Sequence, residues 1–292
     1  MKKKHLFVFL SCFLFLLASS VAYPSGISLG FRLYGALYSM SGGDLNSGMS
    51  GRSKLLEIQA DLAGMSVDGS FQDVRWGMLG GGDLLVHFAP WIGLEVGGGY
   101  CRASKESVVR YDGMPDTGRW TIKPSASAVP VRAGLFFLLP LTSGLSLSAH
   151  GGAMYLMATA ETSFRLESEI TGMWMQETQK ATARGIGFYG GLGLEIRITP
   201  GLFILVEAQG RMARLDGFEG DLNVSNSLGG ADARSGTLYH FRVDLPPGLS
   251  VSSVNLIEIF EEAPTGSGWL DVRPARVDFD GFGAALGFVI RL

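Results

Sequence analysis

Hydrophobic and polar residues alternate with a period of two along the last part of the chain. One set of alternate positions is apolar: Phe282, Ala284, Leu286, Phe288, Ile290 and Leu292. The positions between them are small or apolar, apart from Arg291. Alternation of this kind places successive side chains on opposite faces of a β-strand. The segment therefore predicts a strand with one face toward lipid and the other toward a narrow lumen.

The same alternation recurs in seven further segments. They lie near residues 26–40, 74–88, 91–102, 129–139, 145–155, 188–198 and 202–212. Each is about as long as a strand that crosses a bilayer at a tilt. The chain is therefore predicted to be all-β, an eight-stranded antiparallel up-and-down transmembrane β-barrel.

The connections between these segments alternate between short and long. The short ones, at 89–90, 140–144 and 199–201, all contain proline, which suits a tight reversal and cannot continue a ladder. The long ones are polar and lie at about 41–73, 103–125, 160–184 and 214–275. Short turns at one end and long loops at the other are typical of bacterial outer-membrane barrels, with the long loops extracellular.

The longest of these connections, 214–275, contains a further alternating stretch. Leu238 to Leu245 alternates well, and the prolines that follow it would turn the chain. The next stretch, 251–260, alternates poorly, because Glu258 falls on the same face as Leu256. We expect a hairpin above the membrane, and a barrel of ten strands is the alternative.

The first long connection contains a short helical pattern. Leu55, Ile58 and Leu62 recur at helical spacing within residues 54–63. This spacing predicts a short amphipathic helix against the mouth of the barrel, and an irregular loop is the alternative.

The N-terminal 22 residues have the pattern of a secretory signal peptide. Three lysines precede an apolar run from Leu6 to Leu17, and small residues end at Ala22. The barrel domain is then expected at 23–292. Without Lys2, Lys3 and Lys4 the chain has 21 basic and 27 acidic residues, a net charge of −6, which disfavours nucleic-acid binding.

Only Cys101 would remain as a cysteine of the exported chain, so no intrachain disulfide is expected. Glycine is abundant, with 42 residues, and lies largely within the strand-like segments. Small residues let backbones bend and approach closely, so this composition suits a strongly curved sheet.

Six ionisable residues fall on the inward face of the predicted strands at similar heights above the short turns. They are Arg32, Asp83, Glu95, Arg132, His150 and Glu207. Unpaired charges at the membrane midplane are costly, so the carboxylates and guanidiniums are expected to pair across the lumen. An eight-stranded barrel has room for little more than side chains. The pattern favours a plugged ionic core, and a gated narrow path is the alternative.

Aromatic residues on the outward face fall near the two ends of the predicted strands. Trp76, Tyr100 and Tyr155 would mark the outer membrane boundary, and Phe88, Phe137 and Phe288 the inner one.

Taken together, the leader, the strands and the C-terminal strand resemble the small outer-membrane barrels of the OmpA/OmpW/opacity-protein type. The resemblance is one of pattern and does not extend to the long loops. It implies the bacterial outer membrane as location and the barrel-assembly machinery as a partner. Such barrels usually end in an aromatic residue, whereas this chain ends in Leu292. Phe288, Ile290 and Leu292 are the expected assembly signal.

Three classes of function follow. The charged lumen and the long loops favour a structural or surface-interaction barrel, with an extracellular ligand for the loops left open. A narrow channel, or a carrier of small hydrophobic solutes, is the first alternative. A lipid-modifying enzyme is the second. We expect no enzyme, because Ser148 and His150 share one face deep in the lumen, away from lipid.

No cofactor or metal is expected. The glycine strings at 80–82 and 97–99 do not precede a helix, so they are poor phosphate loops. The loop acids Asp44, Asp216, Glu219 and Asp221 match no known calcium-site spacing.

Overall fold

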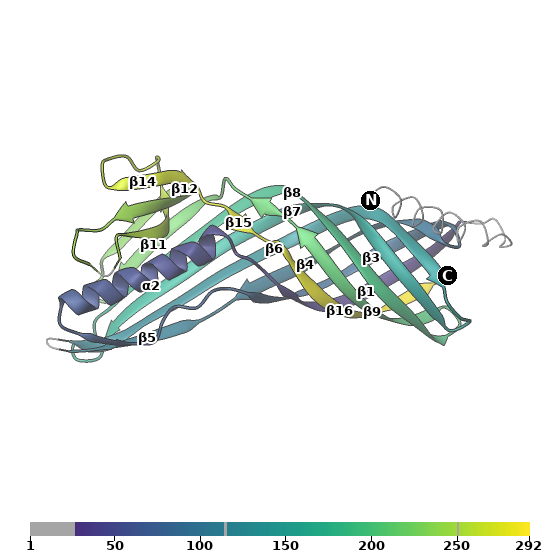
Figure 1. The fold of residues 1–292 in the computed structure, drawn as a ribbon, viewed down its shortest axis with the longest axis horizontal. Helices are drawn as coiled ribbons and strands as arrows, with labels where there is room; N and C mark the ends of the chain where they lie inside the picture. The colour runs from purple at the N-terminus through teal and green to yellow at the C-terminus, as the bar shows by residue number, and fades with distance from the viewer. Residues whose placement is uncertain (1–26, 114–115, 250) are drawn as a thin grey trace, which may run out of the picture.

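The computed structural model describes residues 27–113, 116–249 and 251–292 (Figure 1). The signal peptide expected at 1–22 lies outside these residues. The molecule is elongated, with a tilted barrel at one end and a tall sheet with a helix at the other (Figure 1).

Among the residues that the structure describes, eight strands form a closed ring. Each pairs antiparallel with its neighbours in chain order. The first and last strands close the ring, with Leu33 opposite Phe288. The ring strands are β1 (Ser28–Ser39), β3 (Trp76–Ala89), β4 (Ile92–Ser104), β6 (Thr117–Pro140), β7 (Leu145–Ser168), β8 (Trp174–Thr199), β9 (Leu202–Met212) and β16 (Gly281–Arg291). The predicted up-and-down barrel is therefore confirmed.

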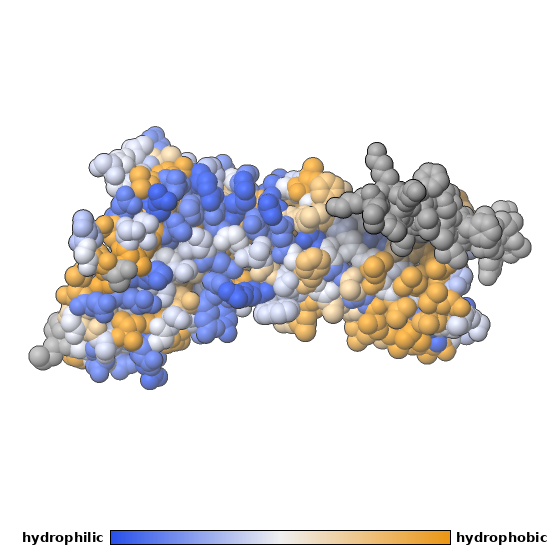
Figure 2. All heavy atoms as spheres, viewed as in Figure 1, coloured by the Kyte–Doolittle hydropathy of each residue, from blue (hydrophilic) through white to orange (hydrophobic). Residues whose placement is uncertain are grey.

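The two faces of the barrel wall follow the alternation of the sequence. Outward positions are apolar and exposed, as with Trp76 at 70% and Phe282 at 79%. Inward positions are buried and hold the polar residues. Figure 2 shows the apolar surface gathered over the barrel, whereas the opposite end is largely hydrophilic. This is the architecture of a transmembrane β-barrel, in which an apolar exterior faces lipid.

The short turns lie where proline predicted them. They join β3 to β4, β6 to β7 and β8 to β9 at one end of the barrel. Gly201 in the last turn has a φ of 81°, a left-handed conformation that glycine adopts without steric cost.

The long segments 103–125 and 160–184 are not loops, which corrects that prediction. β6, β7 and β8 have 24, 24 and 26 residues and remain paired far beyond the barrel. Their outward face becomes polar there, as expected for a strand in water, while the inward face stays apolar at Trp120, Ile122 and Phe164. Because the outward positions of these segments are polar, the apolar alternation of the membrane strands ends there, and the sequence pattern predicted loops.

Shorter strands widen this part of the sheet on both sides, and we call the whole the extension. On the β6 side lie β5 (Ser107–Asp112) and β2 (Ser66–Asp68); on the β8 side lie β11 (Glu219–Asn226), β12 (Ala231–Asp244), β13 (Ser253–Phe260) and β14 (Trp269–Pro274). A separate small pair is formed by β10 (Arg214–Leu215) and β15 (Val277–Asp278).

The hairpin expected after Leu238 is present as β12 and β13, in the extension. Its strands pair with each other and with β11 and β14, and not with the ring. The ten-strand alternative is therefore wrong for the described residues. Within 251–260 the strand β13 forms despite Glu258, because Ile257 and Ile259 bury one face.

The helix α2 (Asp44–Leu62) packs along β13 and also contacts β2, so it lies between the two edges of the extension (Figure 1). A helix is present as predicted, but it begins at Asp44 rather than at residue 54, and it packs on strands of the extension rather than against the mouth of the barrel. Glycines in its first half hid this start from the sequence pattern. They bring the backbones together, because a Cβ on Gly51 would lie 1.7 Å from the carbonyl oxygen of Asn255.

One apolar core runs from the half of the barrel next to the extension into the extension itself, from Tyr34 and Tyr38 to Phe218 and Ile259. A smaller apolar layer lies in the half of the barrel next to the short turns. In the part of the chain that the structure describes, no helix is long and apolar enough to cross a bilayer.

Candidate functional site in the barrel lumen

The structure brings all six ionisable residues of the predicted belt into one buried cluster. Each comes from a different strand: Arg32 from β1, Asp83 from β3, Glu95 from β4, Arg132 from β6, His150 from β7 and Glu207 from β9. They occupy inward positions of strands that the register sets at one height; Arg32, for example, lies directly opposite Asp83. We call this group the ionic cluster.

Arg32 lies at the centre of the ionic cluster. Its Nε lies 2.7 Å from Oδ2 of Asp83, and its Nη2 lies 2.5 Å from Oε2 of Glu95. Its Nη1 lies 3.3 Å from Oε2 of Glu207. A guanidinium presents its donors in a fixed planar fork, so one side chain can bridge three strands in this way.

Arg132 forms a bidentate ion pair with Asp83. Its Nε and Nη2 donate to the two oxygens of Asp83 at 2.7 and 2.5 Å. The guanidinium also lies over two aromatic rings, at 4.7 Å from the centroid of Tyr34 and 5.1 Å from that of Tyr189. Cation–π contacts of this kind add attraction where water is excluded.

His150 lies between two carboxylates. Its Nδ1 lies 2.9 Å from Glu95 and its Nε2 lies 2.9 Å from Glu207. The Nδ1 contact with Glu95 has hydrogen-bond geometry, whereas Nε2 approaches Glu207 without forming a hydrogen bond. A protonated His150 would bring three cationic side chains to face three carboxylates, which is the balance that a buried cluster needs.

Glycines on neighbouring strands make room for the ionic cluster. A Cβ on Gly97 would lie 2.0 Å from Oδ1 of Asp83, and one on Gly191 would lie 2.3 Å from Nε2 of His150. Part of the glycine content of the strands therefore serves the lumen directly.

The sequence reasoning missed two members of this environment, Tyr34 and Tyr189. The Tyr189 hydroxyl donates to Oε1 of Glu95 at 2.6 Å, so the carboxylate accepts from both a tyrosine and His150. Both tyrosines occupy inward positions of their strands. A tyrosine on the lumen face can donate a hydrogen bond from its hydroxyl, and this feature of the sequence could have indicated both residues.

Below the ionic cluster, toward the short turns, the lumen is filled by an apolar layer. It consists of Leu85, Phe136, Phe203, Leu205 and Val289. The ring of His87 packs edge-on against Phe136 at 4.6 Å. Arg291 forms an ion pair with Glu195 nearby, and its guanidinium lies over the ring of Phe203 at 4.3 Å.

The pair Ser148 and His150 does not form a nucleophile–base contact. Both nitrogens of His150 face carboxylates, and the Ser148 hydroxyl has no hydrogen-bond partner among the described residues. Within those same residues, no group of three or more His, Cys, Asp or Glu side chains is placed to hold a metal ion.

No protein-family model matches the chain, and a search of curated proteins finds no match. Among solved structures, the chain is similar to the outer membrane protein OprG from Pseudomonas aeruginosa, at 14% identity and a TM-score of 0.37, over 92% of this chain and 97% of that one. It is also similar to the outer membrane protease OmpT from Escherichia coli, at 10% identity and a TM-score of 0.37, over 94% and 99%. Likenesses this distant indicate neither a family nor an activity.

Proposed function

We propose that this protein is an integral outer-membrane barrel with a sealed lumen, whose role is structural or lies in surface interactions made by the extension. The carrying observation is the filling of the lumen. The ionic cluster links β1 to β9 through Arg32 and Glu207 and links β6 to β3 through Arg132 and Asp83. An apolar layer fills the space on its short-turn side, and the apolar core continues on the side of the extension. A lumen filled in this way offers no continuous aqueous path.

The apolar exterior supports the placement in a membrane. The outward faces of the barrel carry exposed apolar residues all round, and burying such a belt in hydrocarbon is strongly favourable. Trp76 and Tyr100 lie on this face near one rim, and Phe88 and Phe288 near the other. These are the positions at which transmembrane barrels place aromatic girdles.

The last strand supports the proposed assembly signal. Phe288, Ile290 and Leu292 all point outward and are exposed by 53%, 41% and 76%. An apolar row of this kind on the closing strand is available to the barrel-assembly machinery before β1 pairs with it.

Planar-bilayer recording tests the sealed lumen. The unaltered protein is expected to insert without conducting, in a bilayer where a general porin conducts. Glu95→Gln and Glu207→Gln are expected to remain silent, because the apolar layers above and below are unchanged. Repeatable openings in the unaltered protein that vanish in either variant would contradict a sealed lumen.

Labelling of intact cells tests the surface role. Leu228 lies at the tip between β11 and β12 and is 82% exposed, whereas Ser143 lies exposed in the short turn between β6 and β7. A membrane-impermeant maleimide should label Leu228→Cys and spare Ser143→Cys, each in a Cys101→Ala background. The reverse result would place the extension in the periplasm.

A further inference from the structure

The outer surface of the barrel has a hollow over β3 and β4, next to β1. Gly35 of β1 and Gly80 of β3 lie directly opposite each other at outward positions. A Cβ on Gly35 would meet its nearest atom at 3.9 Å, and one on Gly80 would meet nothing within 4 Å. Gly80 forms part of the floor of the hollow, which has a volume of about 590 Å³.

Large apolar and aromatic side chains surround this floor. Each points outward and is exposed by 50% or more: Leu37 of β1, Trp76 and Met78 of β3, and Tyr100 of β4. Toward the short turns, the next outward position of β4 after Tyr100 is Gly98, which has no side chain. The hollow therefore has tall walls beside it and a low wall toward the middle of the apolar exterior.

One arginine lines the hollow at its end nearest the extension. Arg102 is the outward residue that follows Tyr100 on β4, and it lies directly opposite Met78 of β3. Its side chain is exposed, and it forms no ion pair among the described residues. No carboxylate lines the hollow in the same part of the chain. The hollow is thus apolar along its length and positively charged at one end.

Arg102 lies where the apolar exterior of the barrel ends. On its short-turn side the outward residues of β4 are Tyr100, Gly98 and Val96, whereas the next outward residue on the other side is Ser104. Ser127 lies opposite Arg102 on β6. At this level a lipid holds its polar head while its chains extend into the hydrocarbon.

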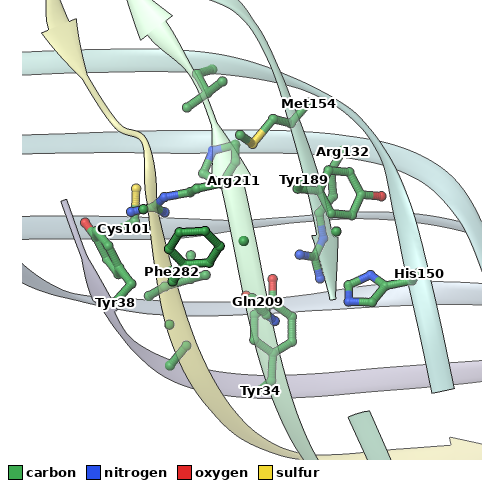
Figure 3. Close-up of a pocket in the computed structure, with 18 residues that line it drawn as sticks. Tyr34, Tyr38, Cys101, Arg132, His150, Met154, Tyr189, Gln209, Arg211 and Phe282 are labelled. Atoms are coloured by element: carbon green, nitrogen blue, oxygen red, sulfur yellow. The ribbon is translucent and has the colours of Figure 1, made fainter. Parts of the chain in front are cut away.

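A second arginine shows why the face of the wall matters. Arg211 of β9 also forms no ion pair among the described residues, but it points into the lumen, where its guanidinium lies 3.6 Å from the centroid of the Tyr38 ring (Figure 3). At this height β9 is paired with both β8 and β16, so the wall separates Arg211 from lipid. Arg102 and the hollow, in contrast, lie on the same outer face.

We propose that the hollow binds one membrane lipid with a net negative phosphate head, the phosphate on Arg102 and an acyl chain over Gly80. The planar fork of a guanidinium matches the oxygens of a phosphate. The hollow is open toward the lipid, so it places no limit on the rest of the head, and its apolar side chains suit an alkyl chain. The site goes beyond a structural barrel. It rests on the proposed placement of the barrel in a membrane and not on the sealed lumen.

Quenching of tryptophan fluorescence by brominated lipids tests the head of the site. The barrel is placed in dioleoylphosphatidylcholine nanodiscs that contain phosphatidylglycerol or phosphatidylcholine with brominated chains. Trp76 lines the hollow, so the difference between the unaltered protein and Trp76→Phe isolates its signal. Brominated phosphatidylglycerol should quench this signal at about threefold to tenfold lower content than brominated phosphatidylcholine, a range between an exposed ion pair and a charge-assisted hydrogen bond.

Arg102→Gln should abolish this preference for the anionic lipid. Arg184→Gln is the matched control, because Arg184 is an exposed outward arginine of β8 that lies away from the hollow. It removes the same charge and should leave the preference unchanged. Equal quenching by the two lipids in the unaltered protein, or a preference that survives in Arg102→Gln, would overturn the proposal. An equal loss in Arg184→Gln would do so too, because overall charge would then explain the preference.

Filling the hollow tests the chain of the lipid without touching Arg102. Gly80→Leu should fold, since nothing lies within 4 Å of its Cβ position, and a heat-modifiable band on electrophoresis checks this. It should lose the preference for phosphatidylglycerol. Ala133→Leu adds bulk at an exposed outward position of β6 away from the hollow and should keep it. An unchanged preference in folded Gly80→Leu would contradict the proposal.

Failure of the lipid site and failure of the membrane placement give different results. A barrel that enters nanodiscs with its heat-modifiable band but quenches equally with both lipids overturns the lipid site alone. A chain that does not enter nanodiscs overturns the membrane placement and the lipid site with it. Bilayer conductance tests the sealed lumen independently of both.

Discussion

Arg132 and Asp83 join two strands that are not neighbours in the barrel. The bidentate pair, at 2.7 and 2.5 Å, runs from β6 to β3 with β4 between them. Asp83 also accepts from Arg32 of β1 on its other side. The carboxylate therefore links three strands at once, one contact reaching the neighbouring strand β1 and the other reaching past β4 to β6.

Replacing Asp83 by Asn should strongly destabilise the barrel. The change leaves two buried guanidiniums with too little negative charge, and breaking a buried pair in this way costs about 3–5 kcal/mol. Urea unfolding in lipid vesicles, followed by tryptophan fluorescence, measures the loss. In the Asp83→Asn background, replacing Arg32 or Arg132 should lower the free energy of unfolding by less than the same replacement does in the otherwise unaltered protein.

Asp73→Asn is the matched control for that experiment. Asp73 pairs with Arg75 at 2.8 Å, but the arginine side chain is 72% exposed. An exposed pair contributes at most about 1 kcal/mol. Similar losses for Asp73→Asn and Asp83→Asn would show that the ionic cluster does not hold the strands together.

The barrel and its polar lumen residues could be predicted from the sequence because both follow from the period-two pattern. Once Leu33 and Phe288 face lipid, Arg32 and Glu95 must face inward. Counting residues from the proline-containing turns then placed these inward side chains at similar heights along the barrel axis. The individual partners could not be read in this way, because they depend on the offset between strands and on which rotamer reaches across the lumen.

The strands of the extension could not be predicted from the alternation for a different reason. Above the membrane only one face of a strand needs to be apolar, so Ala126, Ala158 and Ala181 carry the inward signal with small side chains. Windows that seek strong alternation miss such strands. The start of α2 was missed similarly, since glycines disfavour helices and here serve close packing on β13.

Gly51→Val should detach α2 from the extension. A side chain at this position collides with the backbone of Asn255, and overpacking of a close contact costs about 1–3 kcal/mol. Limited proteolysis should then cut within residues 44–62, while the barrel keeps its heat-modifiable band. Ser50→Val puts the same β-branched residue at the adjacent exposed position and should leave the helix protected. Equal resistance of the two variants would mean that the close approach is not needed for docking.

The attachment of α2 should weaken in acid through Asp44. Burial alone would raise the pKa of this carboxyl, but hydrogen bonds from Arg273, at 2.5 and 2.8 Å, and from the backbone N–H of Arg276 outweigh it and hold the pKa below its ordinary value. An acid with a lowered folded-state pKa stabilises the fold above its unfolded value of about 3.9. That contribution is lost as the pH falls through the folded-state pKa.

Hydrogen exchange of the α2 amides, corrected for the intrinsic rate at each pH, measures this effect. Protection should be full at pH 6 and should fall below about pH 4. Asp44→Asn should show weaker protection at pH 6 and a smaller further loss in acid, because the titrating group is gone. A pH profile of α2 that is the same in both proteins would contradict the role of Asp44.

Tyr189→Phe should cost less than any change of a charged member of the cluster, but more than a tyrosine change on the exterior. The hydroxyl donates to Oε1 of Glu95 at 2.6 Å, and hydrogen bonds to charged groups contribute about 1.5–3 kcal/mol. Tyr100→Phe removes a hydroxyl from the half-exposed outer face and should leave unfolding in urea unchanged. If Tyr189→Phe also leaves it unchanged, Glu95 is held by Arg32 and His150 alone. The ordering of the three variants in one vesicle assay, Asp83→Asn, Tyr189→Phe and Tyr100→Phe, therefore separates charge pairing from hydroxyl donation in the lumen.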